Sequence, residues 1–471
     1  MPKASGLCPF RAPIIRELFP PLATLTIART HSVLNHDLLI TNATLLANPA
    51  DGRLQEGAYL AVTDGAIVAI GAMADLPALP GADRIIDAAS NLVMPGLVNC
   101  HSHGAMTLFR GLADDLPLMS WLTEHIFPTE ARLVDAEMVY WCSKLAAAEM
   151  ILGGTTTVAD GYFHEDAAAR AFCEAGLRTV AAQGIIDFPA PGVPDPKQNI
   201  AAAADFLSTW QGKNPLLTPA LFCHSPYTCS PETLQRAKGL AREAGTLFFT
   251  HLAETREEMA ELKKQHGLTP VGLLHDLGLL DEKTVCVHCV WLEAGDIRLL
   301  RESGAKVVTC PESNMKLGAG IAPLAELLAA GVAVGLGTDG CASNNDLDLF
   351  QEMASCARLH KFGAQEPTPL PSAALLGMAT GGGAGVLGLA GESGGLVVGM
   401  RADCIIIDRR QPHLTPFHNP ETLVHAGRGS DVSTVLIDGR VVMENRQLLS
   451  FDLAETLEEV RRLAGRVRAG E

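Results

Sequence analysis

The chain has 471 residues, of which 48% are hydrophobic and 19% charged, so it is long and apolar enough to bury a large core. Its formal net charge is −17 and no run is rich in Lys or Arg, which argues against nucleic acid and membrane surfaces as partners. Its twelve cysteines are scattered through apolar segments, which favours reduced, buried thiols and a cytoplasmic location. Cys286 and Cys289 have the spacing of half a zinc knuckle, but no second pair follows them.

The two ends of the chain have the pattern of short β-strands. Residues 1–36 contain no apolar stretch long enough for a signal peptide or a membrane span, and we expect a poorly ordered extension there. Residues 37–93 alternate apolar and polar positions between Asp-Gly pairs that favour hairpins. Residues 396–450, with a first strand at 396–398, repeat this pattern, so we expect both ends to pair into one small β-sandwich. Residues 451–471 are expected to form a C-terminal helix.

The middle of the chain alternates strand-like and helix-like segments. The strand-like runs begin near Leu92, Thr155, Arg178, Leu216, Thr246, Thr284, Ala305 and Val332. Helical stretches such as 138–152, 231–244 and 323–330 lie between successive runs. Helix starts are also visible, as in Ser230-Pro231 and in the capping-box spacing of Thr255 and Glu258. Eight such units predict an α/β fold with a (β/α)8 TIM-like barrel over residues 94–395.

Residues that can bind metal follow several of the predicted barrel strands. His101 and His103 come directly after an apolar run, and alternation along a strand sends both imidazoles to the same side. Later strand-like segments end in His251, His288 and Asp339. Active sites of such barrels lie at the carboxyl ends of the strands, where unrelated histidines have no reason to gather. We therefore expect these side chains to share one site.

The expected ligand set is that of a mononuclear metal hydrolase. His101, His103 and His251 offer imidazole nitrogens and Asp339 a carboxylate, a set that suits one divalent ion, Zn²⁺ before Fe²⁺. One position is then left for water, whose pKa falls to about 7 on such an ion. Asp339 has a second oxygen with which it can take the proton of that water.

Two further residues are expected to act beside the metal. Glu254 lies three residues beyond His251, and we predict that it is the general acid/base. The alternative is an ordinary glutamate at a helix start, favoured there by the helix dipole. His288 is predicted to hydrogen-bond the attacking water or the developing oxyanion rather than to bind the metal.

The chain resembles the amidohydrolase superfamily from about Asp37 to its end. Within that superfamily it is similar to the 5-methylthioadenosine/S-adenosylhomocysteine deaminase branch, close to the triazine chlorohydrolases. The resemblance rests on the segments PGLVNCHSHGAMTLFRGLADD, TTTVAD, FCHSPYTCS, HLAET, VHCVWL, NMKLGAGIAP and GTDGCASNN. It implies hydrolytic deamination at C6 of an adenine nucleoside, with release of ammonia.

The resemblance also carries residue roles to matching positions of this chain. It places the metal ligands and the catalytic pair on the six residues already singled out. His224 matches a histidine that contacts substrate, and Glu130 matches an acid that holds the ribose hydroxyls. A carboxylate that accepts from two vicinal hydroxyls is a sensible group for that task.

One position departs from the family pattern. Some members carry an arginine before the glycine of the third strand, suited to the carboxylate of S-adenosylhomocysteine, whereas this chain has Gln183. Glutamine cannot form the charge-assisted fork of arginine, so we predict a preference for methylthioadenosine or adenosine, unless Lys197 substitutes.

Three other functions would make different demands on the sequence. A cyclic-amide hydrolase with two metals would need a bridging lysine on a middle strand, and the segment 155–160 and its neighbouring strands offer none. A triazine hydrolase would use the same metal, water and Glu254 with a different pocket, and stays open as the alternative. A non-catalytic binding protein is disfavoured because no ligand or acid is missing. A homo-oligomer is compatible with the sequence.

Overall fold

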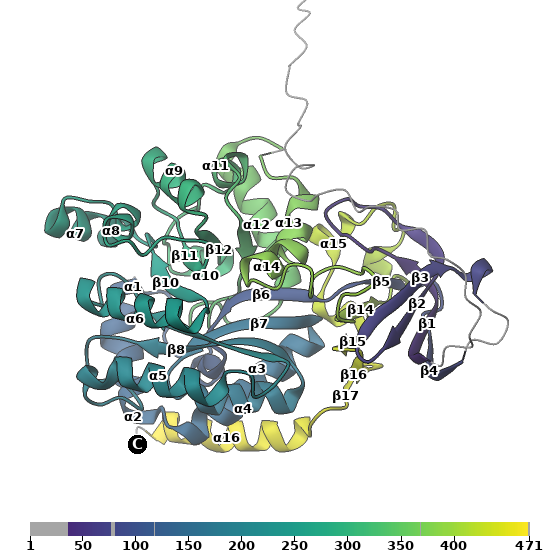
Figure 1. The fold of residues 1–471 in the computed structure, drawn as a ribbon, viewed down its shortest axis with the longest axis horizontal. Coiled ribbons are helices and arrows are strands. Elements are labelled where there is room, and N and C mark those ends of the chain that lie inside the picture. Colours follow the sequence, from purple (N-terminus) through teal and green to yellow (C-terminus); the bar gives the residue numbers. More distant parts are fainter. Residues whose placement is uncertain (1–35, 77–80, 117, 368, 470–471) are drawn as a thin grey trace, which may run out of the picture.

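The computed structural model describes residues 36–76, 81–116, 118–367 and 369–469. The predicted extension at the amino terminus lies outside these ranges, apart from His36, which begins the first strand. Figure 1 shows a barrel wrapped by helices, with a second β-structure on one side of it. Within the described ranges, no helix has the length and apolarity needed to cross a bilayer.

The barrel has eight parallel strands that pair in chain order. They are β6 (Leu97–Ser102), β7 (Thr155–Tyr162), β8 (Arg178–Ile185), β9 (Leu217–Cys223), β10 (Phe248–Leu252), β11 (Thr284–His288), β12 (Lys306–Thr309) and β13 (Val334–Leu336). Just beyond β13, the Asp339 N–H donates to the His101 carbonyl at 3.0 Å, and the Asn99 amide bonds both the N–H and the hydroxyl of Thr338. These bonds tie the last strand to the first, and the predicted barrel is confirmed.

A glycine allows this close approach of the first and last strands. A Cβ on Gly337 would lie 2.9 Å from both the Cβ and the backbone nitrogen of His101. Real Cβ atoms do not come so close to backbone, so any larger residue would push the strands apart beneath the predicted site.

The helices that cover the barrel follow the predicted alternation. They are α3 (Ala136–Leu152), α4 (Glu165–Ala175), α5 (Asn199–Trp210), α6 (Pro231–Ala244), α7 (Arg256–His266), α8 (Pro270–Asp276), α9 (Ala294–Ser303), α10 (Pro311–Lys316), α11 (Leu324–Ala330), α12 (Leu349–Ala364), α13 (Ser372–Met378) and α14 (Gly381–Val386). The Ser230 hydroxyl accepts from the Thr233 N–H at the start of α6, and Pro231 follows the cap as the sequence predicts.

Short elements fill the chain between β6 and α3. They are η3 (Gly104–Phe109), α1 (Leu118–Ser120), η4 (Trp121–Ile126) and α2 (Phe127–Leu133). The other short helices are η2 (Met73–Asp75), η5 (Pro196–Gln198), η6 (Pro412–Leu414), α15 (Thr422–Ala426) and η7 (Gly429–Asp431). The C-terminal helix α16 (Leu453–Ala469) packs along α3, where Arg466 pairs with Asp135 at 3.1 Å.

Strands from both ends of the chain form one mixed sheet. They are β1 (His36–Leu45), β2 (Gln55–Thr63), β3 (Ala66–Ala72), β4 (Ala82–Asp87), β5 (Leu92–Pro95), β14 (Cys404–Ile407), β15 (Val432–Ile437), β16 (Arg440–Glu444) and β17 (Gln447–Leu448). The order is β17-β16-β15-β14-β5-β1-β2-β3, with β4 beside β1. Because β5 pairs with β14, the amino-terminal and carboxyl-terminal strands meet in one structure, as predicted.

Two details of the strand prediction are wrong. The run that starts at Leu92 is two strands, because β5 ends at Pro95 in the mixed sheet and the barrel strand β6 begins only at Leu97. Gly96 makes the step between them, at a point where a Cβ would overlap Thr156. Residues 396–398 form no strand, since glycines flank them closely and the Leu396 N–H bonds the carbonyl of Ala47 instead.

Candidate metal centre

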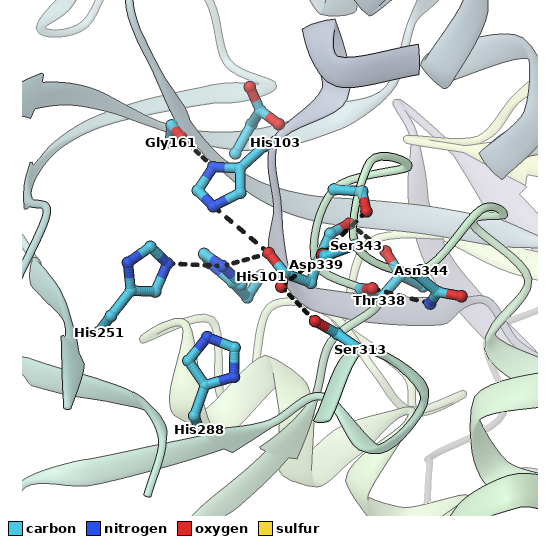
Figure 2. A network of polar contacts seen from close by, with 12 residues as sticks. His101, His103, Gly161, His251, His288, Ser313, Thr338, Asp339, Ser343 and Asn344 are labelled. Atoms are coloured by element: carbon cyan, nitrogen blue, oxygen red, sulfur yellow. Dashed lines mark hydrogen bonds and ion pairs between the residues drawn. The ribbon is translucent and has the colours of Figure 1, made fainter. Parts of the chain in front are cut away.

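Four predicted ligands from three strand ends converge at the carboxyl end of the barrel. One ligand atom each from His101, His103, His251 and Asp339 lie within 4.8 Å of one another. The Nε2 atoms of His101 and His251 are 3.3 Å apart, and Asp339 Oδ1 lies 3.2 Å from His101 Nε2 and 3.4 Å from His103 Nε2 (Figure 2). The lone pairs of three imidazoles and one carboxylate therefore face one small volume.

A break in strand register aims the first two histidines. Val98 and Cys100 belong to the apolar cluster inside the barrel, so strict alternation would also turn Ser102 inward. The pairing of β6 with β7 shifts register between Asn99 and Ser102. The His101 ring then stacks on Phe222 at 5.5 Å, and the two imidazoles lie edge to face at 4.6 Å.

Neighbouring polar groups hold the ligands in place. His103 Nδ1 donates to the Gly161 carbonyl at 2.5 Å, which leaves Nε2 free to bind metal (Figure 2). The second carboxylate oxygen of Asp339, Oδ2, accepts from Ser313 at 2.7 Å and from Ser343 at 2.9 Å. Sequence reasoning missed Gly161, Ser313 and Ser343, because a serine or a backbone carbonyl far along the chain has no pattern that marks it.

The donor set fits a borderline divalent ion. Burial lowers the pKa of His101 to about 4 and also lowers the pKa of His103, so both rings are neutral near pH 7 and can donate a lone pair. Three neutral imidazole nitrogens and one carboxylate oxygen are the ligands that Zn²⁺ and Fe²⁺ accept. The predicted metal-binding site is confirmed at this level.

Glu254 and His288 lie next to these ligands. Glu254 follows β10 by two residues, is buried, and its carboxylate is 3.9 Å from His288 Nε2. His288 Nδ1 bonds Asn314 Oδ1 at 3.0 Å, which fixes the ring with Nε2 toward Glu254. Burial raises the pKa of Glu254, as suits a carboxyl that must carry a proton.

The strand ends at the site have unusual backbone conformations. Ala253, His288 and Asp339 all have left-handed backbones, with φ of 53°, 73° and 61°. Residues other than glycine, asparagine and aspartate rarely adopt this conformation, and it concentrates at functional sites. Each of these turns directs a side chain at or beside the ligand set.

The site opens into a cavity of about 720 Å³. Apolar and aromatic residues make up most of its wall, among them Leu118, Trp121, Leu122, Ile126, Phe127, Tyr162, Phe163, Phe222 and Leu317. The predicted site residues on its wall are Glu130, His103, His224, His251, Glu254, His288 and Asp339. A cavity with an apolar wall and a few converging polar groups is typical of a small-molecule site.

Two predicted substrate contacts lie on the wall and are not part of the ligand set. Glu130 is 3% exposed and accepts a hydrogen bond from the Tyr162 hydroxyl at 2.5 Å. Burial raises its pKa to about 7. His224 follows β9, bonds the Thr228 hydroxyl through Nδ1 at 3.0 Å, and its ring contacts that of His251.

Gln183 does not share this wall. Its side chain is buried on β8, and its amide nitrogen donates to the carbonyl of Gly184 at 3.1 Å. The cavity is lined at this level by Gly184 and Ile185 instead. Lys197 lies exposed in η5 and does not line the cavity either.

The described cysteines are all free thiols. They include Cys286 and Cys289, and all but Cys173 are fully buried. The candidate metal cluster contains none of them.

Comparisons with known proteins agree with this geometry. Residues 92–442 match the Amidohydrolase family. The chain is 47% identical over 436 residues to a 5-methylthioadenosine/S-adenosylhomocysteine deaminase of Syntrophus aciditrophicus, covering 92% of this chain and 98% of that protein. It is 44% identical over 433 residues to a 5'-deoxyadenosine deaminase of Methanosarcina mazei, covering 91% and 98%.

A solved structure is similar along almost the whole chain. An adenosine deaminase of Xanthomonas campestris with bound zinc has a TM-score of 0.89 and 37% identity, covering 92% of this chain and 99% of that one. The family match spans the barrel and all four predicted metal ligands. The chain is an enzyme that belongs to the amidohydrolase family.

Proposed function

We propose that this enzyme removes the C6 amino group of an adenine nucleoside by hydrolysis, with methylthioadenosine as the preferred substrate. Water and the aminopurine would give the 6-oxopurine and ammonia. The observation that carries the proposal is the buried carboxyl of Glu254, which shares one cavity with the metal ligands and faces His288. The relatives that act on methylthioadenosine, S-adenosylhomocysteine, 5'-deoxyadenosine and adenosine support this substrate class.

The metal would be held by His101, His103, His251 and Asp339, and we propose zinc, the ion bound in the similar adenosine deaminase. When bound, a divalent ion lets water act as a strong nucleophile at neutral pH without a strong base. The described residues contain one set of four ligands, which supports one ion per chain.

Glu254 would activate the purine. A proton on its carboxyl, favoured by burial, would pass to N1 of the ring and make C6 more electrophilic. In the described part of the chain no group donates a hydrogen bond to this carboxylate, so it is free to meet a ligand.

His288 and Asp339 would move the remaining proton. Asn314 holds the protonated Nδ1 of His288, so that Nε2 is the atom able to accept a proton near C6. Asp339 keeps Oδ2 on its two serines and has Oδ1 at the centre of the site. The proton that His288 or Asp339 takes from water would pass to the amino nitrogen, which leaves as ammonia. The hydroxyl proton left at C6 would pass to the now ionised Glu254 as the C6 carbonyl forms.

Glu130 and His224 would orient the ribose. Glu130 lines the same cavity as the ligand set, and its ionised carboxylate can accept from the two vicinal hydroxyls of ribose. Tyr162, which donates to Glu130, would fix the carboxylate for that contact.

The cavity favours an uncharged 5' substituent. Among the described residues that line it, none is Lys or Arg, so no cation is at hand for the carboxylate of S-adenosylhomocysteine. This supports methylthioadenosine, adenosine or 5'-deoxyadenosine over S-adenosylhomocysteine.

The predictions of a cytoplasmic location and a homo-oligomer rest on the sequence alone.

A substrate panel tests the proposal. Ammonia release should be measured from methylthioadenosine, adenosine, 5'-deoxyadenosine, S-adenosylhomocysteine, adenine, guanine, cytosine and melamine-type triazines, with metal content on the same sample. We expect methylthioadenosine to have the highest kcat/KM. Comparable kcat/KM for S-adenosylhomocysteine would contradict the 5' preference, and turnover of triazines alone would replace the deaminase by the triazine hydrolase.

A further inference from the structure

Glu258 is a buried acid that the proposed mechanism does not use. It is 5% exposed on the first turn of α7, one helical turn beyond Glu254. One carboxylate oxygen accepts from the Ala253 N–H and the other from the Glu254 N–H, both at 2.8 Å. In the described part of the chain Glu258 forms no ion pair. Its negative charge is therefore stabilised by these two backbone N–H groups.

This arrangement departs from an ordinary capping box. The first half is regular, since the Thr255 hydroxyl accepts from the Glu258 N–H at 3.1 Å. In a capping box the acidic side chain would return to the N–H of the cap, here Thr255. Glu258 instead reaches past the cap to the two residues before it, which include the proposed acid.

The segment that Glu258 holds is strained and fixed on both sides. Ala253 has a φ of 53°, an uncommon conformation for alanine. Its carbonyl accepts from the Val290 and Trp291 N–H groups, which follow His288. The N–H side of the turn is held by Glu258 and the carbonyl side by the segment after β11, so the turn that carries Glu254 is tied to the strand that carries His288.

We propose that Glu258 is a positioning residue that keeps the Glu254 carboxyl in line with the substrate by holding the Ala253–Glu254 turn. This proposal rests on the proposed function, because it needs Glu254 as the proton donor. A displacement of about 1 Å in a reacting group can cost about 10²-fold in rate. Burial raises the pKa of Glu258 to about 7 against the opposing effect of its two N–H bonds, so assays at pH 8 keep it ionised.

A double-mutant cycle tests this role. Glu258→Gln keeps the shape but turns an NH₂ group toward one of the two N–H donors, and we expect kcat to fall about 10- to 100-fold with KM nearly unchanged. Metal content should stay at the wild-type level. In the Glu254→Gln background, measured by single turnover with enzyme in excess, the same change should cost nothing more, because the group that Glu258 positions is gone.

Two further measurements keep the test decisive. Hydrogen exchange in Glu258→Gln should rise in peptides that contain Ala253 and Glu254 and stay unchanged elsewhere. Glu257→Gln, which removes a charge from the neighbouring exposed position of the same helix turn, should keep wild-type kcat. Wild-type kcat in Glu258→Gln, equal losses in both backgrounds, or unchanged local exchange would overturn the role. Failure of the wild-type enzyme to deaminate any adenine nucleoside would instead reject the proposed function.

Discussion

Both ends of the barrel bury charged side chains. At the amino end these charges are fully paired, whereas at the carboxyl end they are only partly paired. At the amino end, Arg178 begins β8 and binds Asp403, the residue before β14 of the mixed sheet, through two nitrogens, at 2.7 and 3.2 Å. Asp403 also accepts from the Ser393 hydroxyl and the Asp438 N–H, both at 2.7 Å. Every charge in this cluster has a partner within the protein, and the cluster joins the barrel to the mixed sheet.

At the carboxyl end the charges are only partly satisfied. The Glu254 carboxylate has His288 no closer than 3.9 Å, and Asp339 Oδ1 is shared between two histidine nitrogens that are neutral at pH 7. A buried acid without partners costs stability and is kept where a ligand supplies the missing interactions. Buried ionic clusters whose charges are all paired thus stabilise this fold, whereas those with unpaired charges mark the site of chemistry.

The largest effect is expected from removing one ligand of the metal centre. His251→Ala removes one of three imidazoles from the set, so bound metal and turnover should both fall to background, while the barrel stays folded. Metal analysis and ammonia release on the same sample check this. His266→Ala, at the exposed end of α7, is the matched control and should change neither. Full activity in a metal-free His251→Ala enzyme would show that the cluster is not the catalytic centre.

Glu254→Gln should separate the acid from the metal. The amide keeps the shape and removes the proton, so kcat should fall by about 10²- to 10⁴-fold with metal content unchanged. Steady-state kinetics with metal analysis measure both quantities. If the variant keeps its turnover, Glu254 is not the proton donor.

Arg178→Met, at the amino end of the barrel, should lower stability and leave catalysis unchanged. It leaves Asp403 buried without its cation, and breaking such a pair costs about 3–5 kcal/mol of folding free energy. Denaturant unfolding should show this loss, while kcat per folded molecule stays the same. Lys263→Met in the exposed pair with Glu293 is the control, with a cost of at most about 1 kcal/mol. An unchanged denaturation midpoint together with a reduced kcat would show that Arg178 serves catalysis and not stability.

Glu130→Gln should show how much a buried carboxyl without a cationic partner costs the fold. The cost appears in the pH dependence of the free energy of unfolding. Burial raises the pKa of Glu130 from 4.5 to about 7, so the folded state resists its ionisation. Wild-type stability from this group is therefore lost as pH rises from 4.5 to 7, by about 3 kcal/mol in all. The variant should be more stable than wild type at pH 8, equal to it near pH 4.5, and have a higher KM for nucleosides. A pH-independent difference in unfolding free energy would contradict the assigned burial.

The barrel and the metal ligands could be predicted because their signals are local. Most barrel strands are apolar runs that helix-forming residues follow, and His101, His251 and Asp339 stand at or just beyond strand ends where the chain turns. Ser230 and Thr255 similarly indicate where their helices begin, because a capping hydroxyl bonds an N–H group only three residues further on.

The missed features depend on contacts between distant residues. The division at Gly96 lies inside an unbroken apolar run, and only the different pairing of β5 and β6 separates the two strands. Ser313, on α10, and Ser343, in the loop after β13, bond Asp339 from segments that the sequence does not bring together. Glu258 has the spacing of a cap, and only the folded turn shows that it holds Ala253 and Glu254.

The smallest effect is expected at Gln183, which separates sequence similarity from geometry. Because its side chain does not line the cavity and bonds the carbonyl of Gly184, Gln183→Leu should change kcat/KM for methylthioadenosine by no more than about twofold. The ratio of kcat/KM for methylthioadenosine and S-adenosylhomocysteine should stay equally constant, since the 5' preference then comes from the absence of Lys and Arg on the wall. A change of this ratio by about tenfold would place Gln183 against the substrate after all, and would make the third strand a determinant of specificity.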